Sequence, residues 1–408
     1  MNILILGLNY APEPVGIGPY TTGTAEFLAA AGHDVTVVCG KPYYPDWKVQ
    51  EFYRNSGVFS SVESGVQVCR VPIYVPSKPN GSRRLIHHAL FAFRAFPEML
   101  RAARAKKPDV VMCIAPSLIS MVAARAVARM FGAKLWLHVQ DFEVEAAFAT
   151  GLLPDGGWLA KAARAFEKWC LKRGMVSTIS PQMCAKLHEL GLSGNCTYEF
   201  RNWAYIDNIR PLEGPSIYRE RWNITTPYVA LYSGNLGNKQ GIEIIPEIAR
   251  ILVRRRDLTF VICGNGASRE RLIAAAEGLG NIRFYDLQPV EMMSELLGLA
   301  TVHLLPQIAG AADLVLPSKL ANMLASGRPV LATAHPDTGL AREVEGCGCA
   351  VLPGNASAMV QTLEMLLDNE EARLQLGSFG RKRAEERWGQ QKILASFGHA
   401  LSKYARSN

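Results

Sequence analysis

The chain contains 408 residues, of which 49% are apolar and 20% are charged. This balance is typical of soluble globular proteins with two or three domains, and it excludes a disordered or collagen-like chain. The formal net charge is +8, and residues 78–107 hold eight basic residues against one acid.

The first half of the chain alternates short apolar runs with segments of helical spacing. Because they are rich in β-branched residues and bounded by turn residues, the apolar runs predict strands buried on both faces of a parallel sheet; they cover residues 3–8, 35–39, 110–115, 135–139 and 176–179. Helices are predicted over residues 21–31, 84–105, 118–131, 158–172 and 182–190. This alternation indicates a doubly wound α/β domain, which we place at residues 1–205.

The same rhythm returns after a stretch rich in proline and glycine, residues 202–226, which we interpret as an interdomain linker. Strands are predicted over residues 228–232, 259–263, 282–285, 302–305, 330–333 and 349–352. They define a second Rossmann-like domain at residues 206–388. For residues 389–408 we expect a C-terminal helix that packs back on the first domain. Two such domains facing a central cleft would bring strand C-termini and helix N-termini together, where a phosphorylated ligand is the first hypothesis.

Glycine-rich turns follow the predicted strands of the second domain. One turn contains Gly234 and Asn235, with Lys239 at the mouth of the next helix, an arrangement suited to a diphosphate. A second turn contains Gly264, Asn265 and Gly266. The alternative for the first turn is a hairpin-like turn with a solvated lysine, and the second is interpreted as a further loop that allows close backbone approach.

A third segment combines a helix N-terminus with polar side chains. Ser318, after Pro317, can cap the helix, the amides of Ser318 and Lys319 would face an anion, and Asn322 lies one turn further on, within reach of a ribose hydroxyl.

In the first domain, two places carry candidate functional residues. Gly16 and Gly18 lie in the loop after the first strand, where glycines allow backbone amides to approach a phosphate. A nicotinamide fingerprint fits poorly, because its third glycine would fall at Thr21. The strand at residues 135–139 delivers a group of ionisable residues, His138, Asp141, Glu143 and Glu145, to its C-terminal edge. The alternative for the histidine is a satisfied core residue.

On these motifs the sequence resembles the retaining GT-B glycosyltransferases that use nucleotide-sugar donors. The resemblance spans nearly the whole chain. It rests on residues 32–38, the Gly16–Gly18 loop, residues 234–241 and residues 317–330. Within that group, residues 42–47, 138–142, 237–241 and 317–320 are most similar to colanic-acid-type exopolysaccharide transferases, which are usually described as fucosyltransferases that use GDP-fucose.

The resemblance implies roles for individual residues. Gly16 and Gly18 match the loop near the donor pyrophosphate, and Lys239 matches the diphosphate lysine. His138 matches a histidine near the sugar, and Asp141 matches the acid of the adjoining motif; with Glu145 they form our candidate catalytic set. The chain departs from the wider group at Asn235, where an arginine is usual, and at Asn322, where a ribose-binding glutamate is usual.

The resemblance therefore implies transfer of a hexose, fucose from GDP-fucose, onto a lipid-linked oligosaccharide during exopolysaccharide assembly. Attack from the face that the nucleotide leaves needs no protein nucleophile, because the diphosphate oxygen can take the acceptor proton. No D-x-D motif stands out, so we expect no metal and no other cofactor. Two alternatives stay open: the same fold using a UDP-linked N-acetylated aminosugar, and a non-catalytic nucleotide-binding subunit of a polysaccharide-assembly complex.

Location and further partners are predicted from charge and cysteine pattern. The sequence shows no apolar run of about 18 residues and no basic leader, and its nine scattered cysteines lack a C-x-x-C spacing, as expected for a cytoplasmic protein without disulfides or structural zinc. Residues 83–97 mix arginines with large apolar side chains. This stretch fits docking at the inner face of an anionic membrane as well as a core-facing helix with a basic solvent side. Nucleic acid is not expected as a partner.

Overall fold

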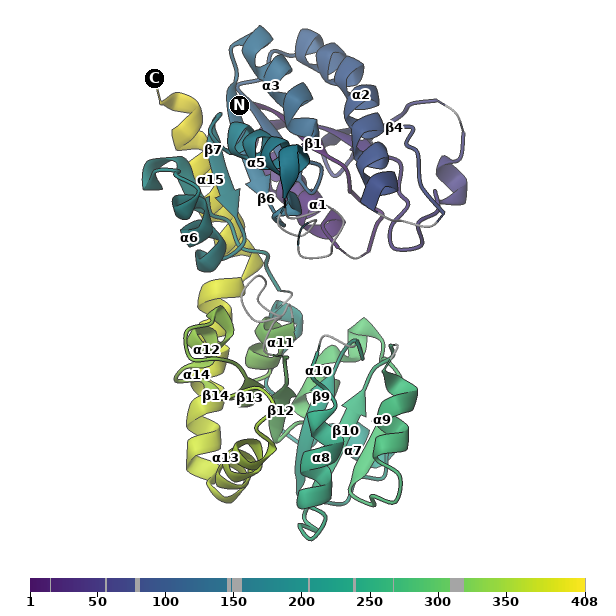
Figure 1. Cartoon of the computed structure of the whole chain (residues 1–408), viewed down its shortest axis with the longest axis vertical. Coiled ribbons are helices and arrows are strands. Elements are labelled where there is room, and N and C mark those ends of the chain that lie inside the picture. The colour runs from purple at the N-terminus through teal and green to yellow at the C-terminus, as the bar shows by residue number, and fades with distance from the viewer. Residues whose placement is uncertain are drawn as a thin grey trace. The chain divides into compact units, whose positions relative to one another are not determined.

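The computed structural model describes residues 1–14, 16–55, 57–77, 81–144, 148, 156–204, 206–237, 240–266, 268–308 and 319–407. The chain divides into two compact units, Met1–Asn202 with Leu394–Asn408 as unit 1, and Trp203–Ile393 as unit 2. Each unit has its own sheet and its own core (Figure 1). Both are doubly wound α/β domains, which confirms the predicted fold class.

Unit 1 is built on a sheet of eight strands in the order β3-β4-β2-β1-β5-β6-β7-β8. All neighbouring pairs are parallel except β3 and β4, which form an antiparallel edge. The strands are β1 Asn2–Gly7, β2 Asp34–Gly40, β3 Phe59–Glu63, β4 Val66–Val71, β5 Val110–Ala115, β6 Lys134–Val139, β7 Met175–Thr178 and β8 Thr197–Glu199. All six residues of β5 are buried, as expected for a central strand covered on both faces.

The helices of unit 1 are α1 Gly18–Ala30, α2 Gly81–Ala105, α3 Ser120–Phe131, α5 Gly157–Leu171, α6 Pro181–Glu189 and most of α15 Gln390–Arg406; two 3₁₀ turns lie at Glu51–Tyr53 and Gly194–Cys196. Apolar residues of α2, α3 and α6 join those of the sheet in one core. Ser180 caps α6 by accepting a hydrogen bond from the backbone N–H of Met183.

The C-terminal helix α15 completes unit 1 (yellow beside teal β7 in Figure 1). The ring of Phe397 is fully buried and stacks on Phe200 with 3.9 Å between ring centroids, and it meets the edge of Trp136 at 5.3 Å. The hydroxyl of Tyr404 donates to the Leu135 carbonyl at 3.2 Å and accepts from the Met175 N–H at 3.3 Å. These contacts tie residues at the end of the chain to strands β6 and β7.

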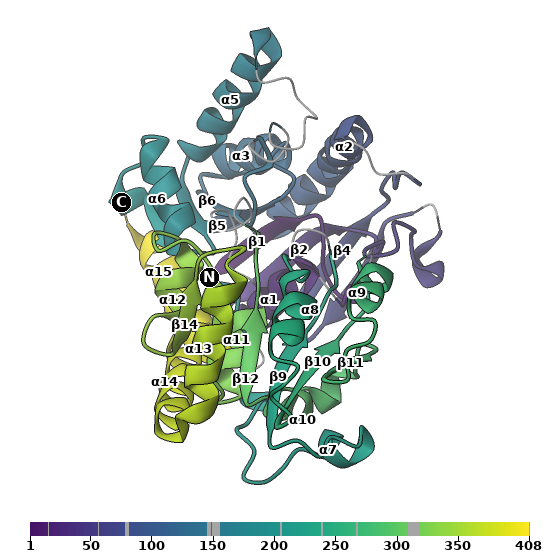
Figure 2. The ribbon, with the colours of Figure 1, turned by 60° about the horizontal axis from the view of Figure 1, so that its bottom comes forward.

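Unit 2 is built on a fully parallel sheet of six strands in the order β11-β10-β9-β12-β13-β14. The strands are β9 Tyr228–Ser233, β10 Leu258–Cys263, β11 Ile282–Tyr285, β12 Val302–Leu305, β13 Val330–Thr333 and β14 Gly348–Val351. Figure 2 shows β9 with its neighbours β10 and β12 and with helix α8 packed against the sheet. The predicted strands of both units agree with the observed ones to within one residue at each end.

The helices of unit 2 are α7 Tyr218–Arg221, α8 Ile244–Ile251, α9 Arg269–Ala275, α10 Met293–Gly298, α11 Lys319–Ala325, α12 Gly339–Val344, α13 Ala356–Asp368 and α14 Glu370–Trp388, with 3₁₀ turns at Ile206–Asn208 and Val290–Met292. Helices α8, α9 and α13 pack in one core with the sheet. Helices α11, α12 and α14 supply a second core. The sheet is therefore sandwiched between two helical layers.

Two parts of the structure were not predicted. The edge hairpin of β3 and β4 was not predicted from the sequence, and neither was the three-residue strand β8. Helices α14 and α15 are separate, because Gly389 leaves the helical conformation with φ −64° and ψ 120° and ends α14. No helix within the described ranges is long and apolar enough to cross a lipid bilayer.

Candidate functional site

Each sheet has a point where the chain reverses its direction of winding. In unit 1 the chain adds β2 on one side of β1 and β5 on the other, and in unit 2 it adds β10 on one side of β9 and β12 on the other. In open parallel sheets, ligands bind outside the carboxyl ends of the strands at this reversal. The loops after β1, β5 and β6 and those after β9, β10 and β12 therefore define the candidate sites of the two units.

In unit 1, a buried carboxylate organises the loop after β1. Glu13 is 3% exposed, and its Oε1 accepts from the backbone N–H groups of Tyr43 at 2.8 Å and Tyr44 at 3.0 Å. Its Oε2 accepts from the Nδ2 of Asn9 at 2.8 Å. Burial raises the pKa of Glu13, while these three hydrogen bonds act to lower it. Glu13 was not predicted as a site residue, because Tyr43 and Tyr44 lie 30 and 31 residues from it in the sequence.

The two predicted glycines of the same loop lie against this carboxylate and its neighbours. Gly16 has φ +74°, and a Cβ there would lie 3.1 Å from the ring of Tyr44. A Cβ on Gly18 would lie 3.1 Å from the Cβ of Glu13. The left-handed φ of Gly16 favours glycine, and a side chain at either position would require its neighbours to shift.

His138 is enclosed in the interior of unit 1 at the end of β6. It is 2% exposed, its Nδ1 lies 2.9 Å from the Ser177 hydroxyl, and its Nε2 lies 3.0 Å from the Nε2 of Gln140. Burial lowers the pKa of His138 to about 3, so the ring is neutral. With Gln140 donating to Nε2, the ring proton lies on Nδ1 and points to Ser177. Both ring nitrogens are thus used within unit 1, as in the core alternative considered from the sequence.

A second carboxyl group with a raised pKa is that of Glu143, which follows β6. Glu143 accepts from the Leu118 N–H at 2.9 Å, and burial raises the pKa of Glu143 to about 7. Its Oε1 lies 3.3 Å from the Nδ1 of His88. Burial, together with His87 and Arg84, lowers the pKa of His88 to about 3, so this is a neutral imidazole beside a carboxyl group that titrates near neutral pH.

The other two acids of this segment differ. Asp141 is exposed at the surface, but the loss of water on its buried side raises its pKa. The positive charge of Arg84 opposes this effect. Glu145 lies outside the described residues. Of the candidate catalytic set, the structure therefore describes His138 and Asp141. It also identifies Glu143, which follows β6 and lies close to Arg84 and His88 of α2.

In unit 2, the glycines after β9 and β10 let two loops touch. A Cβ on Gly264 would lie 1.9 Å from the Gly234 carbonyl oxygen, and a Cβ on Gly266 would lie 2.5 Å from that of Leu236. The N–H groups of Gly234 and Leu236 donate to the carbonyls of Cys263 and Asn265, each at 2.9 Å. These two amides are therefore engaged by the neighbouring loop and are not free to bind a phosphate.

Lys319, the first residue of α11, lies directly on the glycine turn. Its Nζ donates to the Tyr232 hydroxyl at 2.6 Å and lies 4.4 Å from the centre of that ring. A Cβ on Gly234 would lie 2.4 Å from the Lys319 Cε. Burial lowers the pKa of Lys319 to about 8. Within the described part of the chain no carboxylate pairs with it, so this ammonium is suited to an anionic ligand.

Two side-chain oxygens at the carboxyl edge of this sheet and in α11 lack hydrogen-bond partners among the described residues. The Oδ1 of Asn322, one turn along α11, and the Oε1 of Gln307, after β12, are buried without a partner among the described residues. Buried polar atoms without a partner are rare and destabilising, so each of these oxygens is able to accept a further hydrogen bond. Asn235 and Asn265 are exposed at the same edge.

Three further predicted donor residues, Lys239, Pro317 and Ser318, lie outside the described residues. Within the described ranges, no group of three or more histidine, cysteine, aspartate or glutamate side chains is arranged to hold a metal ion.

The comparisons with known proteins agree with this architecture. Residues 15–197 match the family model of the glycosyl transferase 4-like domain, and residues 216–383 match that of glycosyl transferases group 1. The chain belongs to the GT-B glycosyltransferases and is a nucleotide-sugar-dependent glycosyltransferase. It is 38% identical over 378 residues to the "Putative colanic acid biosynthesis glycosyl transferase WcaI" of Escherichia coli strain K12, a match that covers 90% of this chain and 92% of that protein.

Solved structures share the fold at low sequence identity. Sucrose-phosphate synthase from Thermosynechococcus elongatus superposes with a TM-score of 0.71 at 17% identity, over 98% of each chain. Anabaena Alr3699/HepE in complex with UDP superposes with a TM-score of 0.69 at 13% identity, over 99% of this chain and 100% of that one.

Proposed function

We propose that the protein is a retaining hexosyltransferase of exopolysaccharide synthesis, which moves a sugar from a nucleotide sugar to a lipid-linked oligosaccharide. The observation that carries this proposal is the 38% identity to a colanic acid glycosyl transferase over 90% of the chain. At that level and extent, both the donor and the acceptor halves of the two proteins correspond.

The carboxyl edge of the unit 2 sheet would hold the donor. Lys319 has a positive charge without a paired carboxylate in the described chain, and Asn322 has an unpartnered oxygen one helical turn away. A nucleoside diphosphate supplies the complementary groups, since its phosphates are anionic and its ribose hydroxyls donate hydrogen bonds. Lys239 and the amide of Ser318 complete the proposed diphosphate site.

These groups suit the chemistry of sugar transfer. When the bond between sugar and diphosphate breaks, negative charge grows on the departing diphosphate, and a preorganised ammonium stabilises that charge. A diphosphate oxygen would take the acceptor proton on the same face, so the configuration is retained without a protein nucleophile. Neutral His138 would position the end of β6 near the sugar, with Asp141 and Glu145 as candidate acceptor contacts. We propose that turnover needs no metal, and its loss in EDTA followed by recovery with manganese would contradict this.

For the donor we propose GDP-fucose, because of the similarity to colanic-acid-type transferases. The alternative is a UDP-sugar, and the HepE structure with UDP supports keeping it in the test. Thermal unfolding of the full-length protein with GDP, UDP, ADP and dTDP would identify the base, because a ligand that binds the folded state raises its stability. Turnover of the matching nucleotide sugars then identifies the donor, and the absence of turnover with every one would refute the proposal.

The lipid-linked acceptor requires a membrane surface, and α2 offers a suitable face. Its solvent side carries Ile86 and Phe93, 50% and 78% exposed, next to Arg94, while His87 and Phe91 point into the core. Apolar side chains flanked by arginines favour the interface of an anionic membrane.

The membrane proposal is tested by vesicle co-sedimentation. The double variant Phe93→Ser and Arg94→Glu should lose binding to vesicles of phosphatidylglycerol and phosphatidylethanolamine. Phe379→Ser, which changes a 49% exposed phenylalanine on α14, is the matched control. Equal binding by the double variant and the control would exclude α2 as the docking face.

A further inference from the structure

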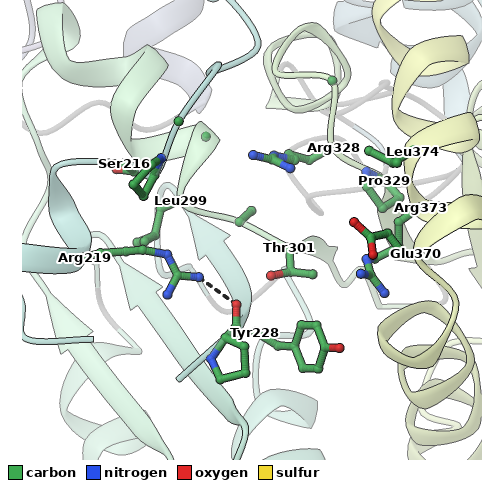
Figure 3. A pocket seen from close by; sticks show the side chains of 16 residues that line it. Ser216, Arg219, Tyr228, Leu299, Thr301, Arg328, Pro329, Glu370, Arg373 and Leu374 are labelled. Atoms are coloured by element: carbon green, nitrogen blue, oxygen red, sulfur yellow. Dashed lines mark hydrogen bonds between the residues drawn. The ribbon is translucent and has the colours of Figure 1, made fainter. Parts of the chain in front are cut away.

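A cavity of unit 2 lies at the opposite end of its sheet from Lys319. It has a volume of about 200 Å³, and its lining includes Tyr228, Thr301 and Pro329. Tyr228 begins β9, and the other two immediately precede β12 and β13. Because all strands of this sheet are parallel, these residues mark its amino edge (Figure 3). The cavity is therefore separate from the proposed donor site.

Three arginines from three different segments line this cavity. Arg219 comes from α7, Arg328 from the turn after α11, and Arg373 from the first turn of α14. In Figure 3 the guanidinium group of Arg328 extends across the cavity toward Ser216, with Arg219 and Arg373 on opposite sides below it. Such a convergence of like charges is unfavourable without an anion.

Two of these arginines donate hydrogen bonds to backbone carbonyls, and none of the three is paired with a described carboxylate. Arg219 donates to the carbonyls of Thr226 at 2.7 Å and Pro227 at 2.8 Å, and Arg373 donates to those of Leu366 and Leu367. These acceptors are neutral. Arg328 forms no hydrogen bond and no ion pair with any described residue.

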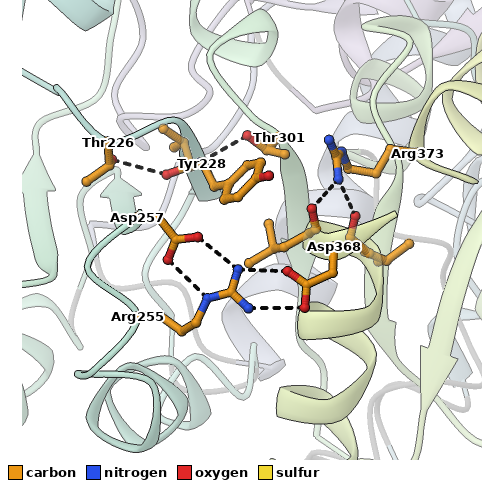
Figure 4. Close-up of polar contacts among 10 residues, drawn as sticks. Thr226, Tyr228, Arg255, Asp257, Thr301, Asp368 and Arg373 are labelled. Carbon is orange, nitrogen blue, oxygen red and sulfur yellow. Dashed lines mark hydrogen bonds and ion pairs between the residues drawn. The ribbon is translucent and has the colours of Figure 1, made fainter. Parts of the chain in front are cut away.

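The nearby acids are engaged elsewhere or exposed. Arg255 binds both Asp257, at 2.9 and 3.0 Å, and Asp368, at 3.0 and 3.3 Å, so it holds both carboxylates in one network (Figure 4). Glu370 lines the cavity but is exposed, and it forms no ion pair with a described residue. The cavity is therefore positive, with three arginines against one solvated acid.

The pKa shifts agree with this account. Burial lowers the pKa of Arg219, and burial together with the charges of Arg219 and Arg373 lowers the pKa of Arg328. A bound anion would remove this repulsion.

We propose that this cavity is a second anion site of unit 2, which binds a phosphoryl group through Arg328, Arg219 and Arg373. The guanidinium fork matches the oxygens of a phosphate, and arginine is the residue that favours such recognition. The volume is below the roughly 300–1,000 Å³ of drug-sized ligand pockets, so the ligand is inorganic phosphate or a phosphorylated monosaccharide. This inference does not depend on the identity of the donor.

The test compares phosphate with chloride at equal ionic strength in thermal unfolding of the full-length protein. Wild type should be stabilised by phosphate, and Arg328→Gln should bind phosphate about tenfold more weakly or worse, as expected for loss of a charge-assisted contact. Arg342→Gln, an exposed arginine of α12, and Lys319→Gln, at the donor edge, should keep the shift. Arg328→Lys should keep part of it, which guards against a folding defect in the glutamine variant.

Glucose 1-phosphate distinguishes the two ligand sources. A larger shift than with inorganic phosphate identifies a sugar phosphate, and an equal shift identifies the free anion. The proposal is overturned if wild type shows no phosphate-specific shift, if Arg328→Gln retains it fully, or if Lys319→Gln abolishes it, since the anion would then bind at the donor edge.

Discussion

Replacing Lys319 with methionine should stabilise the free enzyme at neutral pH. The variant keeps the aliphatic stem that covers Gly234 and removes the buried charge. Burial lowers the pKa of Lys319 from 10.5 to about 8, and each pKa unit corresponds to about 1.4 kcal/mol, so the charge destabilises the folded state by about 3 kcal/mol before solvent screening. The lost hydrogen bond to Tyr232 is worth about 1 kcal/mol. The net expectation is a gain of about 2 kcal/mol at pH 7.

The pH dependence of this gain has a defined sign. Below pH 8 the lysine is charged in both the folded and the unfolded state, and its full unfavourable effect is present. Between pH 8 and 10.5 the folded state loses the proton first, so wild-type stability rises with pH and the advantage of the variant disappears.

Urea unfolding at pH 7, 8 and 9.5 measures both effects, with Lys382→Met, an exposed lysine of α14, as the control. A Lys319→Met variant that is no more stable than wild type at pH 7, or whose advantage does not shrink above pH 8, would contradict the expected effect of the buried charge. The same variant should lose most of its stabilisation by nucleotide, which would link the charge to the donor.

Three further outcomes are expected. Gly264→Ala should destabilise the protein by about 2 kcal/mol or more, because the new Cβ would lie 1.9 Å from the Gly234 carbonyl oxygen. Gly280→Ala, where the new Cβ would have open space around it, should not destabilise the protein in this way. Chemical denaturation measures the free energy of unfolding of both variants. The pKa of the Glu143 carboxyl is raised from 4.5 to about 7, so wild-type stability should fall as pH rises from 4.5 to 7 and level off above pH 7. Glu143→Gln should remove this pH dependence in urea titrations. An unchanged profile in the variant would contradict the raised pKa. Asn322→Ala should leave the melting temperature of the free protein unchanged, since the Asn322 Oδ1 has no partner among the described residues. The same variant should bind nucleotide about tenfold more weakly in calorimetry. A large loss of stability with intact binding would show that Asn322 serves folding instead.

The strands were predictable because a strand that is buried on both faces has an almost continuous run of apolar residues. In β10, all six residues from Leu258 to Cys263 are buried, so the sequence there is an unbroken apolar run. The β3–β4 hairpin lacks that signal, because Phe59–Glu63 forms an edge strand with exposed Ser60 and Val62. Its remaining clue is the turn at Ser64 and Gly65, both with positive φ, a combination typical of two-residue hairpins.

The end of each sheet at which the candidate residues lie was predictable, but the contacts of those residues were not. Carboxyl ends of strands are apparent from the order of elements, which is why the segments of Gly234, Gly264 and Lys319 were identified. The reasons for those residues depend on loops that are distant in sequence: Gly264 accommodates the Gly234 turn, and Lys319 is 87 residues from Tyr232. Glu13 was missed for the same cause, since only the fold brings the amides of Tyr43 and Tyr44 to it.

The return of α15 to unit 1 makes that unit discontinuous along the chain. During synthesis, every residue of unit 2 leaves the ribosome before Phe397 and Tyr404 do. The rings of Trp136 and Phe200 therefore lack their contacts with Phe397 until the last helix emerges. Unit 2 can thus finish folding first, although it is encoded second. Protein truncated near residue 393 would retain a complete second unit and expose an aromatic surface on the first, which makes such fragments prone to aggregation.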